Sequence, residues 1–246
     1  MRLYDEIIHD ILTFLGEQDA HILPVGAAAD PVSRDWQDAG KAMMILQSDM
    51  AYELGGHNLP AVGNTLVTTG KDFVPEDEII LIGKDLPEIT EDTPYARIAL
   101  VRVAEGSIGT GDRLYNTIRN IGYFRYHIYP KGFMLRVSSS NDRESVRVEA
   151  EALNEGLNFT AIGNAMLRAL HLHKEVEAVR IIFVTDPKVD YGRLQDGLKK
   201  TKQITATIDH MLKDVNMDCG SCGLQEICDE IEGLREMHFG MSEEHT

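Results

Sequence analysis

The sequence predicts an α+β (mixed α/β) fold in which one central sheet is flanked by helices and followed by a small helical C-terminal tail. Helical apolar spacing and short strand-like apolar runs both recur, without the strict alternation of a βαβ protein. The near-continuous apolar run at 178–185 is expected at the centre of the sheet, because a strand buried on both faces lacks polar alternation. The 246 residues suffice for one substantial core with an appendage.

Apolar positions three to four residues apart predict the helices. The first, residues 3–15, is followed by Gly16, a natural stop for a helix. The second begins after Ser33, a candidate N-cap residue, and is expected to end near Gly55-Gly56. Further helices are expected at 112–121, 159–173, 190–213 and 223–237.

Short runs of β-branched and aromatic residues predict the strands. The main candidates are 65–69, 78–82, 97–104 and 178–185, with a weaker one at 146–150. Residues 123–129 and 133–138 flank Pro130-Lys131-Gly132, which predicts a hairpin. Residues 57–64 contain Pro60 and Gly63 and are expected to form a loop.

These elements suggest three regions: an N-terminal helical region (1–56), an α+β domain (57–213) and a Cys-rich tail (214–246). The net charge of −16 disfavours a nucleic-acid-binding protein, because neutralising phosphates requires an excess of Lys and Arg. No apolar run approaches the length of about 18 residues needed to span a bilayer. The N-terminus also lacks the continuous apolar stretch of a signal peptide, so a cytoplasmic protein without membrane contact is expected.

The cysteines are the most informative feature, because Cys219, Cys222 and Cys228 follow 218 residues that contain none. A C-x2-C pair with one glycine inside it and another directly after it is a tight turn that brings two sulfurs to one point. Thiolates favour an iron–sulfur cluster, zinc or Cu(I), and the first two normally take four protein ligands. A fourth donor is available in His238, His210, a partner chain or an external ligand. The alternatives are packed reduced thiols and a redox-active dithiol.

Six segments carry a family resemblance through their order along the chain. They are Glu53-Leu54-Gly55-Gly56, 80–86 (Ile-Leu-Ile-Gly-Lys-Asp-Leu), Arg136-Val137-Ser138, 159–163 (Phe-Thr-Ala-Ile-Gly), 179–186 (Val-Arg-Ile-Ile-Phe-Val-Thr-Asp) and the cysteine segment. In this order they resemble the β subunit of the carbon monoxide dehydrogenase/acetyl-CoA synthase complex, the subunit with acetyl-CoA synthase activity. The resemblance covers about residues 53–240 and implies that 57–213 corresponds to the family's middle, CoA-associated domain.

The resemblance also implies a metal centre in the tail. Cys219, Cys222 and Cys228 match ligands of a [4Fe–4S] cluster, Cys222 matches the one that bridges to nickel, and the fourth ligand falls on or near His238. The gap between Cys222 and Cys228 is shorter than in the family. The family's downstream Cys-Gly-Cys nickel motif and its N-terminal docking domain have no counterpart in the sequence. We therefore expect a truncated relative that is not a complete acetyl-CoA synthase, which leaves its status as an enzyme uncertain.

Residues 97–147 form an arginine-rich stretch, with nine basic residues against four acidic ones in a chain of net charge −16. Aromatic residues interleave with the arginines, and a glycine-rich loop at 106–112 precedes a helix. Guanidinium groups bind phosphates, and aromatic faces stack on adenine. The corresponding region of the family is associated with CoA. We therefore expect CoA or another nucleotide to bind at Arg113, Arg119, Arg125 and Arg136. The alternative is a half-exposed sheet with the arginines on its solvent-exposed face and the aromatic residues on its core face.

Three functional hypotheses follow from these features. The first is an acetyl-CoA-synthase-like iron–sulfur protein of anaerobic one-carbon or CO metabolism. It would have an accessory or electron-transfer role beside a CO dehydrogenase or a corrinoid protein. The second is a non-catalytic binding module with a structural zinc in its tail. The third is a CoA-dependent enzyme of another chemistry.

Overall fold

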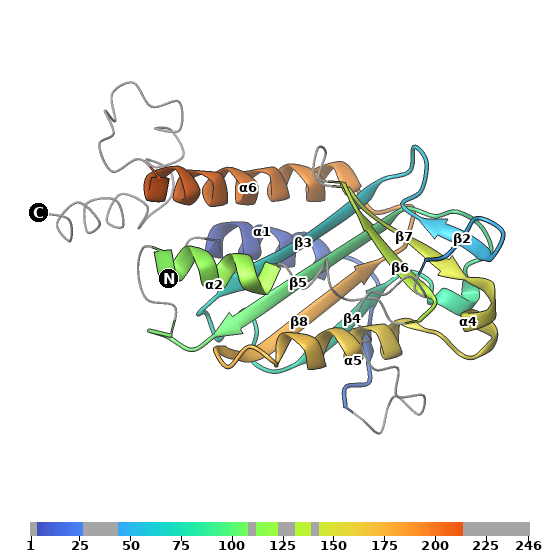
Figure 1. Cartoon of the computed structure of the whole chain (residues 1–246), viewed down its shortest axis with the longest axis horizontal. Helices are drawn as coiled ribbons and strands as arrows, with labels where there is room; N and C mark the ends of the chain where they lie inside the picture. The colour runs from blue at the N-terminus through green and yellow to red at the C-terminus, as the bar shows by residue number, and fades with distance from the viewer. Residues whose placement is uncertain (1–3, 27–43, 108–111, 123–130, 139–142, 214–246) are drawn as a thin grey trace, which may run out of the picture.

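A computed structural model gives the fold of the chain and describes residues 4–26, 44–107, 112–122, 131–138 and 143–213 (Figure 1). Its elements in order are α1 (Asp5–Gly16), β1 (Ala20–Leu23), β2 (Met50–Leu54), β3 (Ala61–Thr68), β4 (Glu78–Ile82), a 3-10 turn (Leu86–Glu88), β5 (Tyr95–Val103), α2 (Asp112–Gly122), β6 (Phe133–Val137), β7 (Glu144–Glu149), α4 (Ala150–Asn154), α5 (Phe159–Leu170), β8 (Val176–Val184) and α6 (Tyr191–Lys213). The fold is mixed α/β, as predicted. Within the described ranges, no helix has the length and apolar character needed to cross a membrane.

The larger sheet has five strands in the order β1-β4-β8-β5-β3. β4 runs parallel to β8 and β3 parallel to β5, whereas the β1–β4 and β5–β8 pairs are antiparallel. β8 lies at the centre, which confirms the position predicted from its continuous apolar run. Its last four residues are all buried, because helices or strands cover both faces of the sheet there.

A second sheet corrects the prediction of a single central one. β2, β7 and β6 form a separate antiparallel sheet of three strands. β6 pairs with β7, and the predicted hairpin partner of β6, residues 123–129, lies outside the described residues. Local patterns predict that a segment is extended but not which strand it pairs with, so the division into two sheets was not visible in the sequence.

Two local predictions were wrong for a related reason. The helix expected to end near Gly55-Gly56 is replaced over its last residues by β2, which pairs with β7 almost 100 residues later. The loop expected at 57–64 belongs to β3 from Ala61 onward, where the chain pairs in parallel with β5. In both cases a distant partner stabilises a strand that local spacing does not favour.

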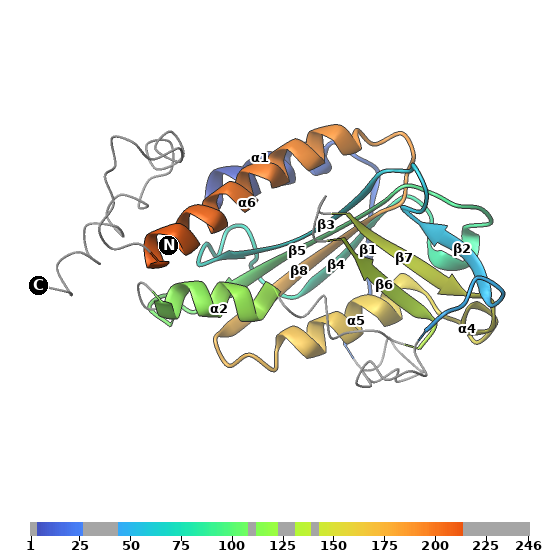
Figure 2. The ribbon, with the colours of Figure 1, turned by 45° about the horizontal axis from the view of Figure 1, so that its top comes forward.

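Helices cover the larger sheet on both faces. Figure 2 shows α1 and α6 on one face and α5 on the other, where α5 contacts β4 and β8. α1 packs against α6, with the Arg193 guanidinium 4.6 Å from the centre of the Phe14 ring. α2 packs against β3 and α6. This last arrangement leaves a space where α2, α6 and β3 meet.

Candidate functional site

The described arginines of the 97–147 stretch are mostly held by partners inside the protein. Arg102 donates to the carbonyls of Val74 and Pro75 at 2.7 and 3.0 Å. Arg143 donates to three loop carbonyls, those of Gly55, His57 and Leu59, each at 2.9 Å. These contacts hold loops in place. Arg102 and Arg143 therefore have a structural role, although the arginine-rich composition of the stretch suggested an anion site.

Arg136 and Arg147 share one carboxylate on the outer face of the small sheet. Arg147 Nε lies 2.7 Å and Arg136 Nη1 3.0 Å from Glu53 Oε1. Glu53 is only 5% exposed, so the two guanidinium groups compensate a buried charge. A Cβ on Gly56 would lie 2.5 Å from Glu53 Oε2, so this position must stay glycine for the carboxylate to fit. The packing explains why glutamate and glycine occur together in the segment 53–56.

A second ion pair lies between the two sheets. The Arg97 guanidinium on β5 donates to both oxygens of Glu144 on β7, with Nη2 2.6 Å from Oε2. Both side chains are almost fully buried. A Cβ at Gly63 on β3 would lie 2.2 Å from Glu144 Oε2, so the missing side chain of Gly63 leaves room for the carboxylate. Burial lowers the pKa of Arg97, but the adjoining Glu144 carboxylate outweighs burial and leaves that pKa above its usual value.

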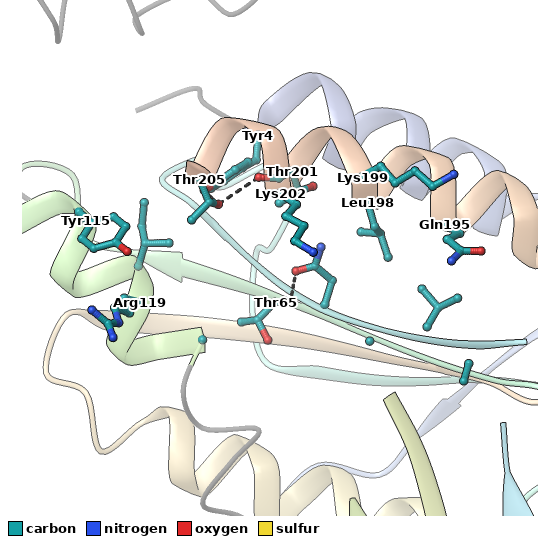
Figure 3. Close-up of a pocket in the computed structure, with 16 residues that line it drawn as sticks. Tyr4, Thr65, Tyr115, Arg119, Gln195, Leu198, Lys199, Thr201, Lys202 and Thr205 are labelled. Atoms are coloured by element: carbon teal, nitrogen blue, oxygen red, sulfur yellow. Dashed lines mark hydrogen bonds between the residues drawn. The ribbon is translucent and has the colours of Figure 1, made fainter. Parts of the chain in front are cut away.

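A pocket of about 560 Å³ lies where α2, α6 and β3 meet (Figure 3). Its wall is formed by Tyr4, Ala61, Val62, Gly63, Asn64, Thr65, Tyr115, Ile118, Arg119, Gly122, Gln195, Leu198, Lys199, Thr201, Lys202 and Thr205. The Tyr4 hydroxyl lies 3.0 Å from Thr205 Oγ1, which ties the start of the described chain to α6. The volume is within the range of roughly 300–1,000 Å³ typical of small-molecule sites.

The structure does not gather the four predicted anion-binding arginines into one described cluster. Arg119 lines the pocket, whereas Arg136 bonds to Glu53 and is not part of the pocket wall. Arg113 lies in α2, but its side chain is not described, and Arg125 lies outside the described residues. Sequence reasoning missed the contribution of α6 to the pocket, for which the run Lys199-Lys200-Thr201-Lys202 was the available signal.

The predicted metal ligands Cys219, Cys222, Cys228 and His238 all lie outside the described residues. Within the part of the chain that the structure describes, no three His, Cys, Asp or Glu side chains are grouped so as to hold a metal ion. The metal centre therefore stays a prediction from the sequence.

Comparison with known protein families identifies the family to which the chain belongs. The family described as the CO dehydrogenase/acetyl-CoA synthase complex beta subunit matches residues 37–189. The chain belongs to this family. By that description, its members are subunits of the CO dehydrogenase/acetyl-CoA synthase complex. No curated protein matches the chain.

The matched range of this beta-subunit family runs from before β2 to just after β8, so it includes both sheets except β1. Three of the segments that carried the resemblance meet at the ends of the parallel strands β4 and β8. Asp85 Oδ1 accepts the N–H groups of Leu86 and Phe159, at 2.7 and 2.8 Å. Thr185 Oγ1 donates to the Lys84 carbonyl at 2.8 Å.

Gly83 and Gly163 explain why glycine occurs in these family segments. Gly83 has φ 109°, and a Cβ there would lie 2.4 Å from the Asp186 nitrogen. A Cβ on Gly163 of α5 would lie 2.8 Å from Ile79 of β4, so the glycine allows close helix–sheet packing. These family segments therefore form the region where α5 packs against β4 and β8. The part of the pocket wall that α6 supplies lies beyond the matched range.

Proposed function

We propose that the protein is an acetyl-CoA-synthase-like iron–sulfur protein of anaerobic one-carbon or CO metabolism, with an accessory or electron-transfer role. The observation that carries the proposal is the order of two features: the beta-subunit match over 37–189, and then the cysteine segment from Cys219 to Cys228. All three cysteines of the sequence fall in that segment, so a cluster bound there would use every thiolate in these 246 residues. A CO dehydrogenase or a corrinoid protein is the proposed partner.

The cluster would be held by Cys219, Cys222 and Cys228, with His238 as the proposed fourth ligand. Thiolate ligands hold such clusters, and they tune the reduction potential together with nearby charge and solvent exposure. The chemistry that a bound cluster supplies is one-electron transfer.

Anaerobic purification of the full chain tests this proposal. We expect a brown protein with a broad absorption band near about 400 nm and about four irons per chain. Cys222→Ser should remove most of the iron, because it takes away a thiolate ligand. Ser221→Ala, in the same turn, is the matched control and should leave the iron content unchanged. An iron-free wild-type protein would contradict the proposal, and a colourless protein with about one zinc per chain would favour the structural-zinc module.

His238 is tested separately by two replacements. His238→Ala should lower cluster loading and His238→Cys should restore it, because cysteine supplies the usual fourth thiolate. If neither change alters the iron content, another donor completes the site.

The second part of the proposal is that the arginine-rich stretch binds CoA or another nucleotide. Arg119 supports it by its position at a pocket, and the contact of Arg136 with Glu53 weakens the case for that residue. The double variant Arg119→Ala/Arg125→Ala is expected to weaken CoA binding about tenfold or more in calorimetry. Arg168→Ala, an exposed arginine on α5, is the control for loss of one charge. No detectable CoA binding by the wild-type protein would refute this part.

A further inference from the structure

The β3 side of the pocket is a strand edge. β3 is the last strand of the larger sheet as described, and it pairs in parallel with β5. In a parallel pair, alternate residues of a strand direct both of their backbone groups to the partner. The Tyr95 N–H donates to the Pro60 carbonyl at 3.0 Å, which places the even-numbered residues of β3 on the β5 side. The backbone groups of Ala61 and Gly63 therefore point away from β5, and both residues line the pocket.

Gly63 leaves a backbone donor and a backbone acceptor without partners. The Thr65 N–H, on the same edge of β3, is satisfied by the Asn64 side chain at 2.7 Å. The outward N–H and carbonyl of Gly63 meet no hydrogen-bond partner among the described residues, although Gly63 is buried. A buried backbone group without a hydrogen bond is costly. The pocket therefore offers a ligand one donor and one acceptor from the same residue.

α6 contributes a third polar group without a partner. Thr201 is 5% exposed, and its Oγ1 has no hydrogen-bond partner among the described residues. Figure 3 shows α6 with Thr201 on one side of the pocket and β3 with Thr65 on the other. A hydroxyl both donates and accepts, so a ligand between the two elements can bond to Thr201 and to the Gly63 backbone.

These groups select the chemistry of the ligand. An ionised carboxylate or phosphate has acceptors only, so it cannot satisfy the Gly63 carbonyl, whereas an amide supplies both N–H and C=O. The wall contains no Asp or Glu, and its Lys and Arg side chains already interact within the protein. The buried side chains of Val62, Ile118 and Leu198 also line the pocket and can contact methylene and methyl groups. The pocket therefore fits an uncharged chain that carries amide groups.

We infer that the pocket holds the pantetheine arm of bound CoA. This arm is an uncharged chain in which two amide bonds flank a β-alanyl unit. The Gly63 backbone would bond to the N–H and C=O of that unit, and Thr201 to another polar group of the arm. The inference rests on the proposed CoA site and extends it: the arginine-rich stretch would hold the phosphates, and the pocket beside Arg119 the arm.

Calorimetry on the full chain compares CoA with its two parts. Adenosine 3′,5′-bisphosphate carries charge but lacks the arm, and pantetheine is the arm without the nucleotide. We expect CoA to bind about ten times more tightly than the bisphosphate, because the arm adds hydrogen bonds and apolar contacts. Pantetheine should compete with CoA, and salt should hardly affect pantetheine binding, because the arm is uncharged.

A variant of α2 locates the arm by filling the pocket. Gly122→Leu should remove the advantage of CoA over the bisphosphate, because Gly122 lines the pocket and a Cβ there meets no described atom within 4 Å. Asn120→Leu is the matched control, since Asn120 is exposed on the same helix and lies outside the wall. It should change CoA binding by less than about twofold.

A variant of α6 tests the hydroxyl. Thr201→Val keeps the volume of the side chain and removes its hydroxyl, so CoA binding should weaken by about threefold or more. Thr207→Val makes the same change at a buried threonine of α6 outside the wall and should leave CoA binding unaltered. Circular dichroism melting checks that every variant is folded.

Two results would overturn the inference. One is equal affinity of the wild-type protein for CoA and for the bisphosphate, which would leave the proposed CoA site standing without a place for the arm. The other is an advantage of CoA that neither Gly122→Leu nor Thr201→Val changes, since the arm would then lie elsewhere. The absence of any CoA binding would refute the proposed CoA site. In that case, pantetheine binding that both variants weaken would still support the pocket as the site of the arm, and its absence would overturn the inference as well.

Discussion

Replacing Glu144 with glutamine is expected to lower the free energy of unfolding by about 3–5 kcal/mol, because it leaves the Arg97 charge buried without its counter-ion. The Arg97 side chain is 0% exposed and that of Glu144 1%, so water cannot take over the role of the carboxylate. The pair also joins β5 to β7, the strand of the small sheet that contacts both β3 and β5 of the larger sheet. Urea unfolding followed by circular dichroism measures the loss.

Two further variants separate the charge effect from the effect of shape. The double variant Arg97→Met/Glu144→Leu removes both charges and should be more stable than Glu144→Gln, because apolar residues of similar volume often replace a buried ion pair without loss. Glu105→Gln makes the same replacement at an exposed glutamate and should alter the free energy of unfolding by less than about 0.5 kcal/mol. A loss below about 1 kcal/mol for Glu144→Gln would show that the buried pair does not stabilise the junction of the sheets.

Replacing Phe159 with alanine is expected to cost about 3–5 kcal/mol of unfolding free energy, because the side chain is fully buried where three elements meet. Its ring stacks on Phe183 of β8 at a centroid distance of 4.5 Å and makes a T-shaped contact with the Phe133 ring of β6 at a centroid distance of 6.4 Å. Phe159 therefore connects α5 with a strand of each sheet. Truncation would remove both ring contacts and leave a cavity.

Phe159→Leu is the matched control for this prediction. Leucine keeps most of the apolar volume, so the loss should be clearly smaller than for alanine, and both should be measured by urea unfolding. The Asn158 side chain accepts from the Ala161 N–H at 2.8 Å and caps α5 in either variant. Equal losses for leucine and alanine would mean that the specific ring contacts, and not the buried volume, stabilise this region.

Much of the secondary structure was predictable because it depends on local patterns. β4 was expected at 78–82 and is observed at Glu78–Ile82, and the segment from Phe159 begins α5 as predicted. The apolar run of β8 also predicted its central place, because burial on both faces is visible in the sequence of a single strand. The order of the short segments predicted the beta-subunit family that the match over 37–189 confirms.

The candidate site was predictable only in part. The arginine-rich composition pointed to an anion, but the structure engages Arg136 and Arg147 with Glu53 and places Arg119 alone of the four predicted residues in the described pocket wall. Composition cannot distinguish these roles, because a guanidinium that binds a phosphate and one that compensates a carboxylate occur in the same kinds of sequence. The cysteine centre stays a prediction from spacing and resemblance.

By itself the sequence determined the helices and strands with strong local patterns and the family, and it showed that all three cysteines lie within residues 219–228. The tertiary structure decided which strands share a sheet, which carboxylate Arg97 meets 47 residues away, and where α6 adds Lys202 to a wall begun by β3. The physical reason is the range of the interactions. Helix periodicity and strand burial act between near neighbours, whereas strand pairing, a buried ion pair and a pocket join residues that only folding brings together.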